Sequence, residues 1–243
     1  MLSKNQIKLI NSLHQKKYRN KHELFIVEGK KSVTEFLQSS FELESLFVLE
    51  NHEYDNQDVI NKTIEVTYNE LKKISALKNP NQVLAVFHIP KNDVLLNNDL
   101  TLALDDVKDP GNLGTIIRLC DWFGIKQLVC SKETVDCYNP KVVQASMGSL
   151  TRINIVYTDL SEFISNSNLS VYVSLMNGDN IYQSNLPKEA IIVMGNEANG
   201  ISNEIISLAT NKISIPRFGN LHQTESLNVA TATSVILSEF RRG

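Results

Sequence analysis

The sequence is poor in the residues that would indicate a disulfide-rich, metal-binding, fibrous or membrane protein. Its 243 residues include only three cysteines, at 120, 130 and 137, and no CxxC pair, which argues against both a disulfide framework and a zinc knuckle. Ten glycines and six prolines are too few for a collagen-like or low-complexity chain. No apolar run reaches the roughly 18 residues of a membrane helix, and the first residues are polar and basic rather than secretory. We therefore expect a cytoplasmic globular protein with no membrane segment and no metal site.

Positive charge gathers at the start of the chain, although the whole chain is slightly acidic. The formal net charge is −3, from 24 basic and 27 acidic residues. Residues 1–31 contain eight Lys or Arg and two Glu, which gives +6 there and −9 in the rest. Phosphates are attracted by clustered cations rather than by net charge, so this segment suits a polyanion, although a solvated helix face would look the same.

Residues 1–90 mix helix and strand patterns. Ser3 is placed to cap a helix, residues 25–27 form a short apolar strand, and 46–49 and 83–89 indicate further strands. The polar segment 91–98 has the composition of a linker. We therefore predict a small α/β domain over 1–90, a linker over 91–98 and a second domain over 99–243.

The second domain alternates between strands and helices. Apolar strands are expected at 100–107, 126–131, 152–157, 170–176, 190–195 and 212–216, and helices at 112–125, 139–150, 202–209 and 226–242. This alternation predicts a parallel sheet covered on both faces. Ligands bind such sheets beyond the carboxyl ends of the strands, so the loops there are the candidate site.

The first candidate loop and the helix after it span residues 105–118. Asn112 stands where a helix cap is expected, and Arg118 lies on a helix face from which it points back toward the loop. A guanidinium beside a helix N-terminus suits a phosphate or a ribose. The alternative is that Arg118 pairs with Asp105 or Asp109.

Two further loops follow strands of the same domain. Gly195-Asn196-Glu197 and Gly200 permit a tight loop that matches neither a dinucleotide fingerprint nor a P-loop. The other loop follows Pro216, and we expect Ser226 to begin the last helix, with Asn228 near the loop mouth. Each loop on its own could be an ordinary connection.

The three loops together resemble the motifs of a known family. In this order they are similar to the motifs of the SpoU/TrmH family of RNA ribose 2'-O-methyltransferases in the SPOUT superfamily. The matching patterns are NxGxxxR at 112–118, GNExxG at 195–200 and IP…SLN at 215–228. The likeness covers residues 100–243. The stretch KYRNKHELFIVEGKKSVTEFL at 17–37 also resembles the opening of the small substrate-binding domain of ribosomal-RNA members.

The resemblance implies a fold, a cofactor and an assembly. The fold would be α/β, with a SPOUT parallel sheet and a deep trefoil knot after a small α/β RNA-binding domain. The cofactor would be S-adenosyl-L-methionine, and the chain would form a homodimer through the catalytic domain. By position, Gly195, Glu197, Ile215, Leu227 and Asn228 would bind the cofactor.

The resemblance also implies methyl transfer to a ribose 2'-hydroxyl, with ribosomal RNA as the expected substrate. Arg118 would orient the ribose-phosphate, stabilise oxyanion charge and, under strong perturbation, accept the proton, although a guanidinium normally stays protonated. Asn112, Ser226 and Asn228 would support that geometry, and Glu197 is the alternative proton acceptor. The alternatives for the whole chain are a transfer-RNA methyltransferase and a non-catalytic RNA-binding or ribosome-assembly factor.

RNA contacts are expected in the basic first domain. The candidates are Lys16, Lys17, Arg19 and Lys30, together with Arg118 in the second domain. Two departures from the family pattern bear on the cofactor site: the loop 217–225 is longer than usual, and Ala230 stands where relatives have serine.

Overall fold

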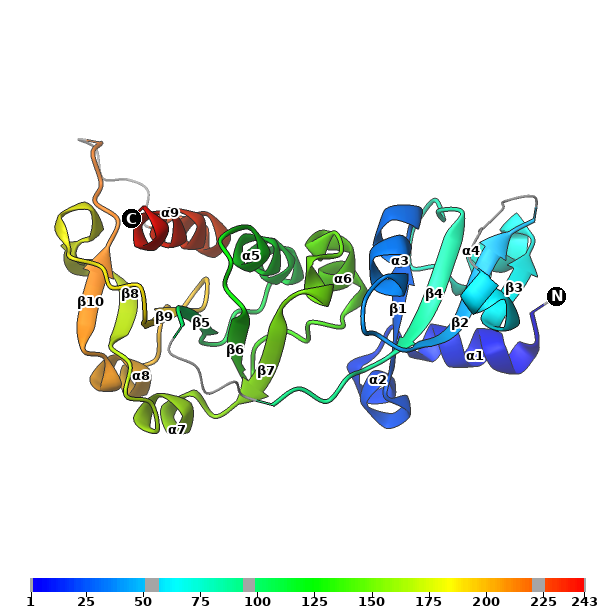
Figure 1. The fold of residues 1–243 in the computed structure, drawn as a ribbon, viewed down its shortest axis with the longest axis horizontal. Helices are drawn as coiled ribbons and strands as arrows, with labels where there is room; N and C mark the ends of the chain where they lie inside the picture. Colours follow the sequence, from blue (N-terminus) through cyan, green and yellow to red (C-terminus); the bar gives the residue numbers. More distant parts are fainter. Residues whose placement is uncertain (1, 51–56, 94–98, 220–225, 243) are drawn as a thin grey trace. The chain divides into compact units, whose positions relative to one another are not determined.

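The computed structural model describes residues 2–50, 57–93, 99–219 and 226–242 (Figure 1). They group into two units: one holds Met1–Lys91 with Asp136–Thr151, and the other holds Asn92–Val135 with Arg152–Gly243. The chain therefore passes between the units three times, whereas the sequence suggests one passage at a linker over 91–98. Residues 94–98 of that linker lie outside the described part of the chain.

The first unit is built on a four-stranded sheet in the order β1-β4-β2-β3. The strands are β1 (Leu24–Glu28), β2 (Leu43–Leu49), β3 (Thr63–Val66) and β4 (Val83–His88); β4 is antiparallel to β1 and β2, and β3 is parallel to β2. The helices are α1 (Lys4–Ser12), α2 (Lys16–His22), α3 (Lys30–Leu37), α4 (Tyr68–Ile74) and the 3-10 helix η1 (Gln57–Lys62). As predicted, Ser3 caps α1, because its side chain accepts a hydrogen bond from the Gln6 N–H.

Apolar side chains cover both faces of this sheet. Leu24 and Ile26 of β1 pack in a core with residues of α1 and α4, whereas Phe25 lies among the aromatic rings of Phe36, Phe41, Phe87 and Tyr138. Successive residues of a strand point to opposite faces, which explains how β1 serves both cores. Phe25 is fully buried, so it belongs to the core.

The segment Asp136–Thr151 belongs to the first unit, although it follows a strand of the second. It contains α6 (Pro140–Ser146) and the 3-10 helix η2 (Ser149–Thr151), and α6 packs against β1. The Tyr138 ring lies 4.6 Å from that of Phe25, and a buried Arg19 binds Asp136. The sequence pattern predicts this helix but not the unit it joins.

The second unit is a six-stranded parallel sheet in the order β10-β8-β9-β5-β6-β7, which confirms the predicted parallel sheet. Its strands are β5 (Thr101–Leu104), β6 (Gln127–Ser131), β7 (Asn154–Thr158), β8 (Val171–Asn180), β9 (Ile191–Met194) and β10 (Asn211–Ser214). Its helices are α5 (Pro110–Trp122), α7 (Leu160–Ser165), α8 (Asn203–Leu208), α9 (Val229–Arg241) and the 3-10 helix η3 (Ile181–Gln183).

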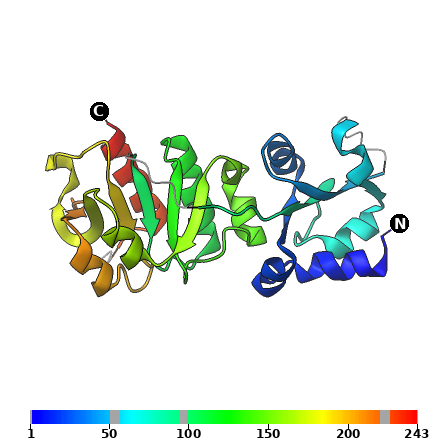
Figure 2. The same ribbon diagram turned by 60° about the horizontal axis from the view of Figure 1, so that its bottom comes forward.

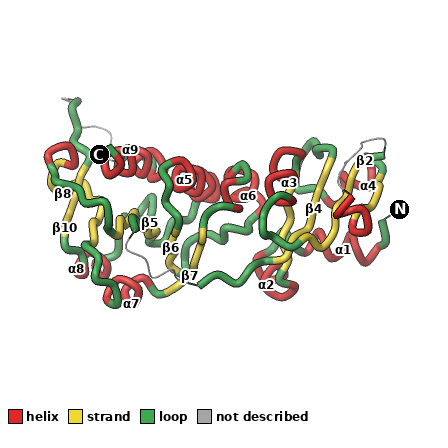
Figure 3. Tube along the Cα trace, in the orientation of Figure 1, coloured by secondary structure: helices red, strands yellow, loops and turns green. Residues whose placement is uncertain are grey.

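Helices cover both faces of the parallel sheet. α5 and α9 pack together on one side, and α7 and α8 on the other, where they close an apolar core over β8 and β9 (Figures 1 and 3). In the turned view, α9 (red) runs across its face of the sheet (Figure 2). This burial on both sides explains why β5, β9 and most of β6 are continuous apolar runs.

The strand order places two candidate loops side by side. β5 pairs with β6 on one side and with β9 on the other, so the loops after β5 and β9 leave the sheet as neighbours. A change in the direction of strand order is where such sheets bind ligands. Among the described residues, no helix is long and apolar enough to span a bilayer, and no three His, Cys, Asp or Glu side chains gather as metal ligands would.

Candidate functional site

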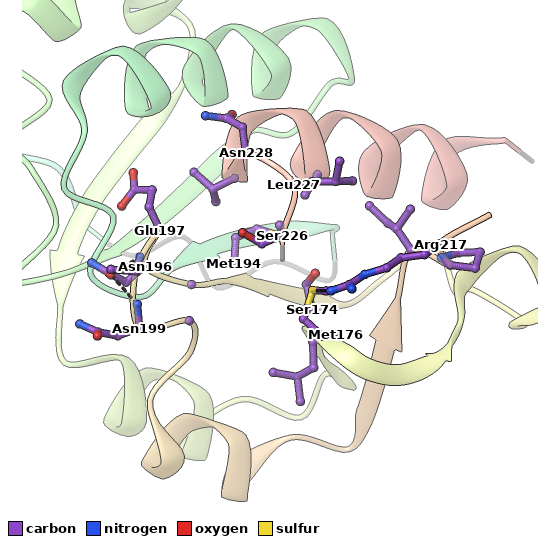
Figure 4. Close-up of a pocket in the computed structure, with 18 of the residues that line it drawn as sticks. Ser174, Met176, Met194, Asn196, Glu197, Asn199, Arg217, Ser226, Leu227 and Asn228 are labelled. Carbon is purple, nitrogen blue, oxygen red and sulfur yellow. Dashed lines mark hydrogen bonds between the residues drawn. The ribbon is translucent and has the colours of Figure 1, made fainter. Parts of the chain in front are cut away.

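A cavity of about 1040 Å³ opens beside the carboxyl ends of β9 and β10 (Figure 4). It is lined by residues of β8, by the loop after β9, by the chain after β10 and by the residues that lead into α9. Its lining includes these residues predicted from the sequence: Gly195, Glu197, Ile215, Ser226, Leu227 and Asn228. Residues 220–225, which complete the longer 217–225 loop, lie outside the described part of the chain.

The loop after β9 is a tight turn that requires glycine. Asn196 and Gly200 exchange two backbone hydrogen bonds of 2.9 Å, and Gly200 adopts a positive φ of 71°. A Cβ at Gly195 would lie only 2.4 Å from the Gly200 carbonyl carbon, closer than any side chain can approach. The motif therefore fixes the backbone of residues 195–200 along one wall of the cavity.

Acidic residues after β5 fasten this turn to the first loop. The Asp105 carboxylate accepts a hydrogen bond of 2.7 Å from the Ser202 N–H, and the Asp106 carbonyl accepts one of 2.7 Å from the Asn196 amide. Asp106 adopts a left-handed φ of 62°, which turns its carbonyl toward the second loop. Asp105 and Asp109 thus have backbone donors as partners, so the predicted alternative in which they pair with Arg118 is not what the structure shows.

Two helix caps differ from the expected positions. Asp109, not Asn112, caps α5: its carboxylate accepts a hydrogen bond of 2.8 Å from the Asn112 N–H. Pro110 then starts the helix, because its fixed φ suits the first position and it has no N–H to satisfy. In α9 the cap is Asn228 rather than Ser226, since the Asn228 side-chain oxygen Oδ1 accepts from the Ala230 and Thr231 N–H groups.

Freed from capping, the Asn112 side chain links all three loops. Its amide nitrogen donates to Glu197 Oε1 at 2.9 Å, and its oxygen accepts from the Asn228 amide nitrogen at 2.8 Å. The carboxylate accepts only, so it fixes the orientation of the Asn112 amide, which in turn fixes that of Asn228. The Asn228 oxygen is then left facing the first N–H groups of α9. One anion therefore sets the orientation of both amides.

Glu197 is held ionised at the centre of these contacts. Partial burial favours its neutral form, but hydrogen bonds from Asn112 and from the Lys108 and Asp109 N–H groups outweigh that effect and lower the pKa of its carboxyl. A carboxylate with a lowered pKa and donors on both oxygens is a weak base. The geometry therefore favours loop positioning over the role of proton acceptor.

Arg118 is exposed on α5 and is not among the described residues that line the cavity of its own chain. Gly111, Thr115 and Trp122 are exposed at helical spacing with it, and Trp122 is 83% exposed. Asn112, Glu197 and Asn228 thus join the three motifs, whereas Arg118 faces solvent.

The cations expected to bind RNA fall into two groups. Lys16, Lys17 and Lys30 are exposed, as RNA contact requires. Arg19 is only 1% exposed: it donates to Asp136 at 2.5 and 2.9 Å and to the Leu13 carbonyl at 2.8 Å. This corrects the prediction for Arg19, whose guanidinium is used inside the first unit and cannot reach a phosphate.

The motif analysis missed part of the cavity wall. Met176, Arg217 and Phe218 line the cavity, and the Arg217 guanidinium lies 3.9 Å from the Met176 sulfur. Met176 comes from the middle of a strand and carries no sequence signal. Phe218 could have been noticed as an aromatic residue in a polar loop.

Comparison with known proteins yields matches over both units. Residues 99–238 match the SpoU rRNA Methylase family, and residues 4–85 match the MRM3-like substrate binding domain. The 23S rRNA guanosine 2'-O-methyltransferase RlmP of Bacillus subtilis is 28% identical over 98% of this chain and 97% of its own length.

Solved structures match the whole chain. A TrmH-family RNA methyltransferase from Porphyromonas gingivalis is 36% identical with a TM-score of 0.88, and the match covers 100% of this chain and 99% of that one. The rRNA methyltransferase of Sinorhizobium meliloti, solved with AdoMet bound, is 29% identical with a TM-score of 0.88, over 100% of this chain and 96% of that one.

Proposed function

Because the chain belongs to the SpoU rRNA methylase family, we propose that it transfers the methyl group of S-adenosylmethionine to a ribose 2'-hydroxyl of ribosomal RNA. The observation that carries the proposal is the cavity beside which hydrogen bonds among Asn112, Glu197 and Asn228 join the three loops. RlmP of Bacillus subtilis is named for this reaction on 23S rRNA, and the Sinorhizobium meliloti relative was solved with AdoMet. The cytoplasmic location expected from the sequence stays a prediction.

The cavity suits a ligand with apolar and polar parts. Small-molecule sites have volumes of roughly 300–1,000 Å³ and combine apolar walls with a few fixed polar groups. Here Met194, Ile215 and Leu227 supply apolar surface, and Ser174 and Asn228 supply polar groups. We propose that the cofactor is held by Gly195, Glu197, Ile215, Leu227 and Asn228.

The bound cofactor supplies an activated methyl group, so the chain's residues need only align the acceptor and handle its proton. Alignment alone lowers a barrier by up to about 7–11 kcal/mol. Arg118 would bind the ribose-phosphate and stabilise negative charge on the 2'-oxygen, while Asn112, Ser226 and Asn228 keep the loops in register. Glu197, ionised and already accepting hydrogen bonds, would position Asn112.

We propose that each site takes Arg118 from a second copy of the chain. Arg118 and Trp122 share an exposed face of α5, and Arg118 is not among the described residues lining its own cavity. A homodimer through this face would bury Trp122 and bring one guanidinium to the opposite site. Aromatic residues and arginine are the types enriched at such interfaces.

We also propose that the C-terminal part of the chain is threaded as a trefoil knot. β10 lies at the edge of the sheet, yet the helix that follows it packs on α5, which follows the central strand β5. To make that return, the chain passes the 195–200 loop, with which residues 226–229 share the cavity wall. This course and the family membership both support a knot.

In the first unit, Lys16, Lys17 and Lys30 would track phosphates of the substrate. Its match to the MRM3-like substrate binding domain, together with the name of RlmP as a 23S rRNA methyltransferase, favours ribosomal RNA over transfer RNA. We keep 1–90, 91–98 and 99–243 as the proposed domain limits, with Asp136–Thr151 packed as part of the first unit.

The test is methylation of RNA from a strain that lacks this protein. Labelled S-adenosylmethionine and total RNA are incubated with the wild-type chain, with Arg118→Ala and with Arg242→Ala, an exposed arginine at the end of α9. We expect a labelled 2'-O-methyl nucleoside in ribosomal RNA with the wild-type chain and the Arg242 variant, and a loss of at least 100-fold in rate with Arg118→Ala, roughly the size of one transition-state contact.

Other outcomes separate the alternatives. Labelled nucleosides in transfer RNA would support the proposed reaction but contradict ribosomal RNA as its substrate. RNA binding with no label, unaffected by Arg118→Ala, would support a non-catalytic RNA-binding or ribosome-assembly factor and contradict the proposal.

A further inference from the structure

Three exposed apolar side chains line the cavity. Phe218 is 83% exposed, Met176 58% and Leu227 49%, and all three line the same cavity. Single exposed apolar residues are ordinary on protein surfaces, but a group around one opening marks a binding surface. They come from β8, from the chain after β10 and from the chain before α9, so the fold brings them together.

A cation completes this group. The Arg217 guanidinium lies 3.9 Å from the Met176 sulfur, on the side of the cavity away from Asn196 and Glu197 (Figure 4). An aromatic ring and a guanidinium both offer flat faces, and the guanidinium also attracts phosphate. This combination matches an unpaired nucleotide, whose base stacks on aromatic rings and arginine planes.

The chemistry of the reaction places a base at this rim. In a nucleotide the base is attached to the ribose carbon next to the one that carries the 2'-oxygen. When that oxygen points into the cavity, the base must lie within one sugar's width of it, at the mouth. The 2'-hydroxyls of an A-form helix lie in a shallow minor groove, so an unpaired nucleotide reaches into a cavity more readily, and stacking at the rim offsets the cost of unstacking its base.

We propose that Phe218, assisted by Arg217, is the stacking platform for the base of the nucleotide being methylated. The proposal rests on the proposed function and adds its substrate-positioning element. Phe218 binds the base, whereas the cofactor is bound by the residues proposed above to hold it. The platform recognises any flat base, so it selects for an unpaired nucleotide rather than for a particular sequence.

The kinetic test compares three replacements of Phe218 in the full chain. Phe218→Ala removes the ring, Phe218→Leu keeps apolar bulk without a π-face, and Phe218→Trp keeps the face. We expect the KM for RNA to rise about tenfold in the Ala and Leu variants, which corresponds to about 1.4 kcal/mol, and to stay within about twofold of wild type in the Trp variant. The KM for S-adenosylmethionine should not change.

A spectroscopic test uses the Trp variant directly. Trp122 is the only tryptophan of the wild-type chain, so the additional emission of Phe218→Trp reports on position 218. RNA from the deletion strain should quench this emission, and S-adenosylmethionine alone should not.

Several outcomes would overturn the platform. One is an unchanged KM for RNA in Phe218→Ala, and another is a KM for RNA in Phe218→Leu equal to that of the wild type. A third is that S-adenosylmethionine alone quenches the Phe218→Trp emission and that Phe218→Ala raises the KM for S-adenosylmethionine instead of that for RNA, which would assign the ring to the cofactor's adenine. Failure of the proposed function looks different: the wild-type chain itself would methylate no RNA, and the fluorescence titration would still decide whether position 218 meets a base.

Discussion

At the scale of single residues, Glu197 illustrates how a carboxylate can hold a site together without exchanging protons. Each of its oxygens accepts hydrogen bonds, and its donors belong to the first candidate loop. A glutamine at 197 would keep one acceptor but turn an NH₂ group toward a backbone N–H. The Asn112 amide would then lose the anion that fixes its orientation.

We therefore predict that Glu197→Gln lowers kcat roughly tenfold. This corresponds to about 1.5 kcal/mol, the lower limit for a charge-assisted hydrogen bond, and the lower limit applies because Glu197 is only partly buried. Asn112→Ala should cost a similar factor, and the double variant should cost little more than either single one. A positioning role also predicts that Glu197→Gln costs no more than Asn112→Ala, which leaves the carboxylate in place. A much larger loss of kcat in Glu197→Gln than in Asn112→Ala would identify Glu197 as the proton acceptor instead.

Stability should follow the lowered pKa of Glu197. Because its pKa is below the unfolded value, the stabilisation is present at neutral pH and is lost as the pH falls below about 4.3. Thermal melts of wild type and Glu197→Gln should therefore differ at pH 7, and the difference should shrink as the pH is lowered. A difference that grows toward low pH would contradict this assignment.

At the scale of elements, α2 and the Asp136–Thr151 segment depend on one buried ion pair. The Asp136 side chain is 11% exposed and that of Arg19 only 2%, and the guanidinium also donates a hydrogen bond to the carbonyl of Leu13, the residue that ends α1. Removing one partner of a buried pair costs about 3–5 kcal/mol, because the other charge stays buried.

Arg19→Ala should therefore lower the free energy of unfolding by about 3 kcal/mol in urea denaturation, and Asp136→Ala by a similar amount. Lys17→Ala, two residues away and exposed, is the matched control: it should change stability by less than about 0.5 kcal/mol and instead weaken RNA binding. Equal stabilities for the Arg19 and Lys17 variants would refute the structural role of Arg19.

The same elements show what a sequence pattern can and cannot predict. Periodicity identifies β5, β9 and α9 because their burial repeats along the chain, and it places the three loops at one edge of the sheet. It cannot tell Arg19 from Lys17, since burial of a cation depends on Asp136, more than a hundred residues away. Nor does it choose between Asp109 and Asn112 as a cap, because both residue types cap helices and only the start at Pro110 decides.

At the scale of the whole molecule, Arg118 is the feature that one chain leaves unexplained. A residue expected to meet the ribose lies on an exposed helix face beside Trp122. Two copies packed through that face would each complete the other's site. The cofactor loops and the arginine would then belong to different subunits, and activity would require the dimer.

A mixed dimer tests this arrangement. One subunit carries Arg118→Ala and the other Asn228→Ala, with different affinity tags so that only the heterodimer is purified. If Arg118 acts on the opposite site, one site of the heterodimer holds both lesions and the other holds neither, so about half of the wild-type activity should return although each homodimer is strongly impaired. If Arg118 acts within its own subunit, each site holds one lesion and the activity of the heterodimer should lie between those of the two impaired homodimers. Size-exclusion chromatography of Trp122→Arg supplies the second measurement: burial of Trp122 in the interface predicts a monomer, because a charge there would be desolvated without a partner.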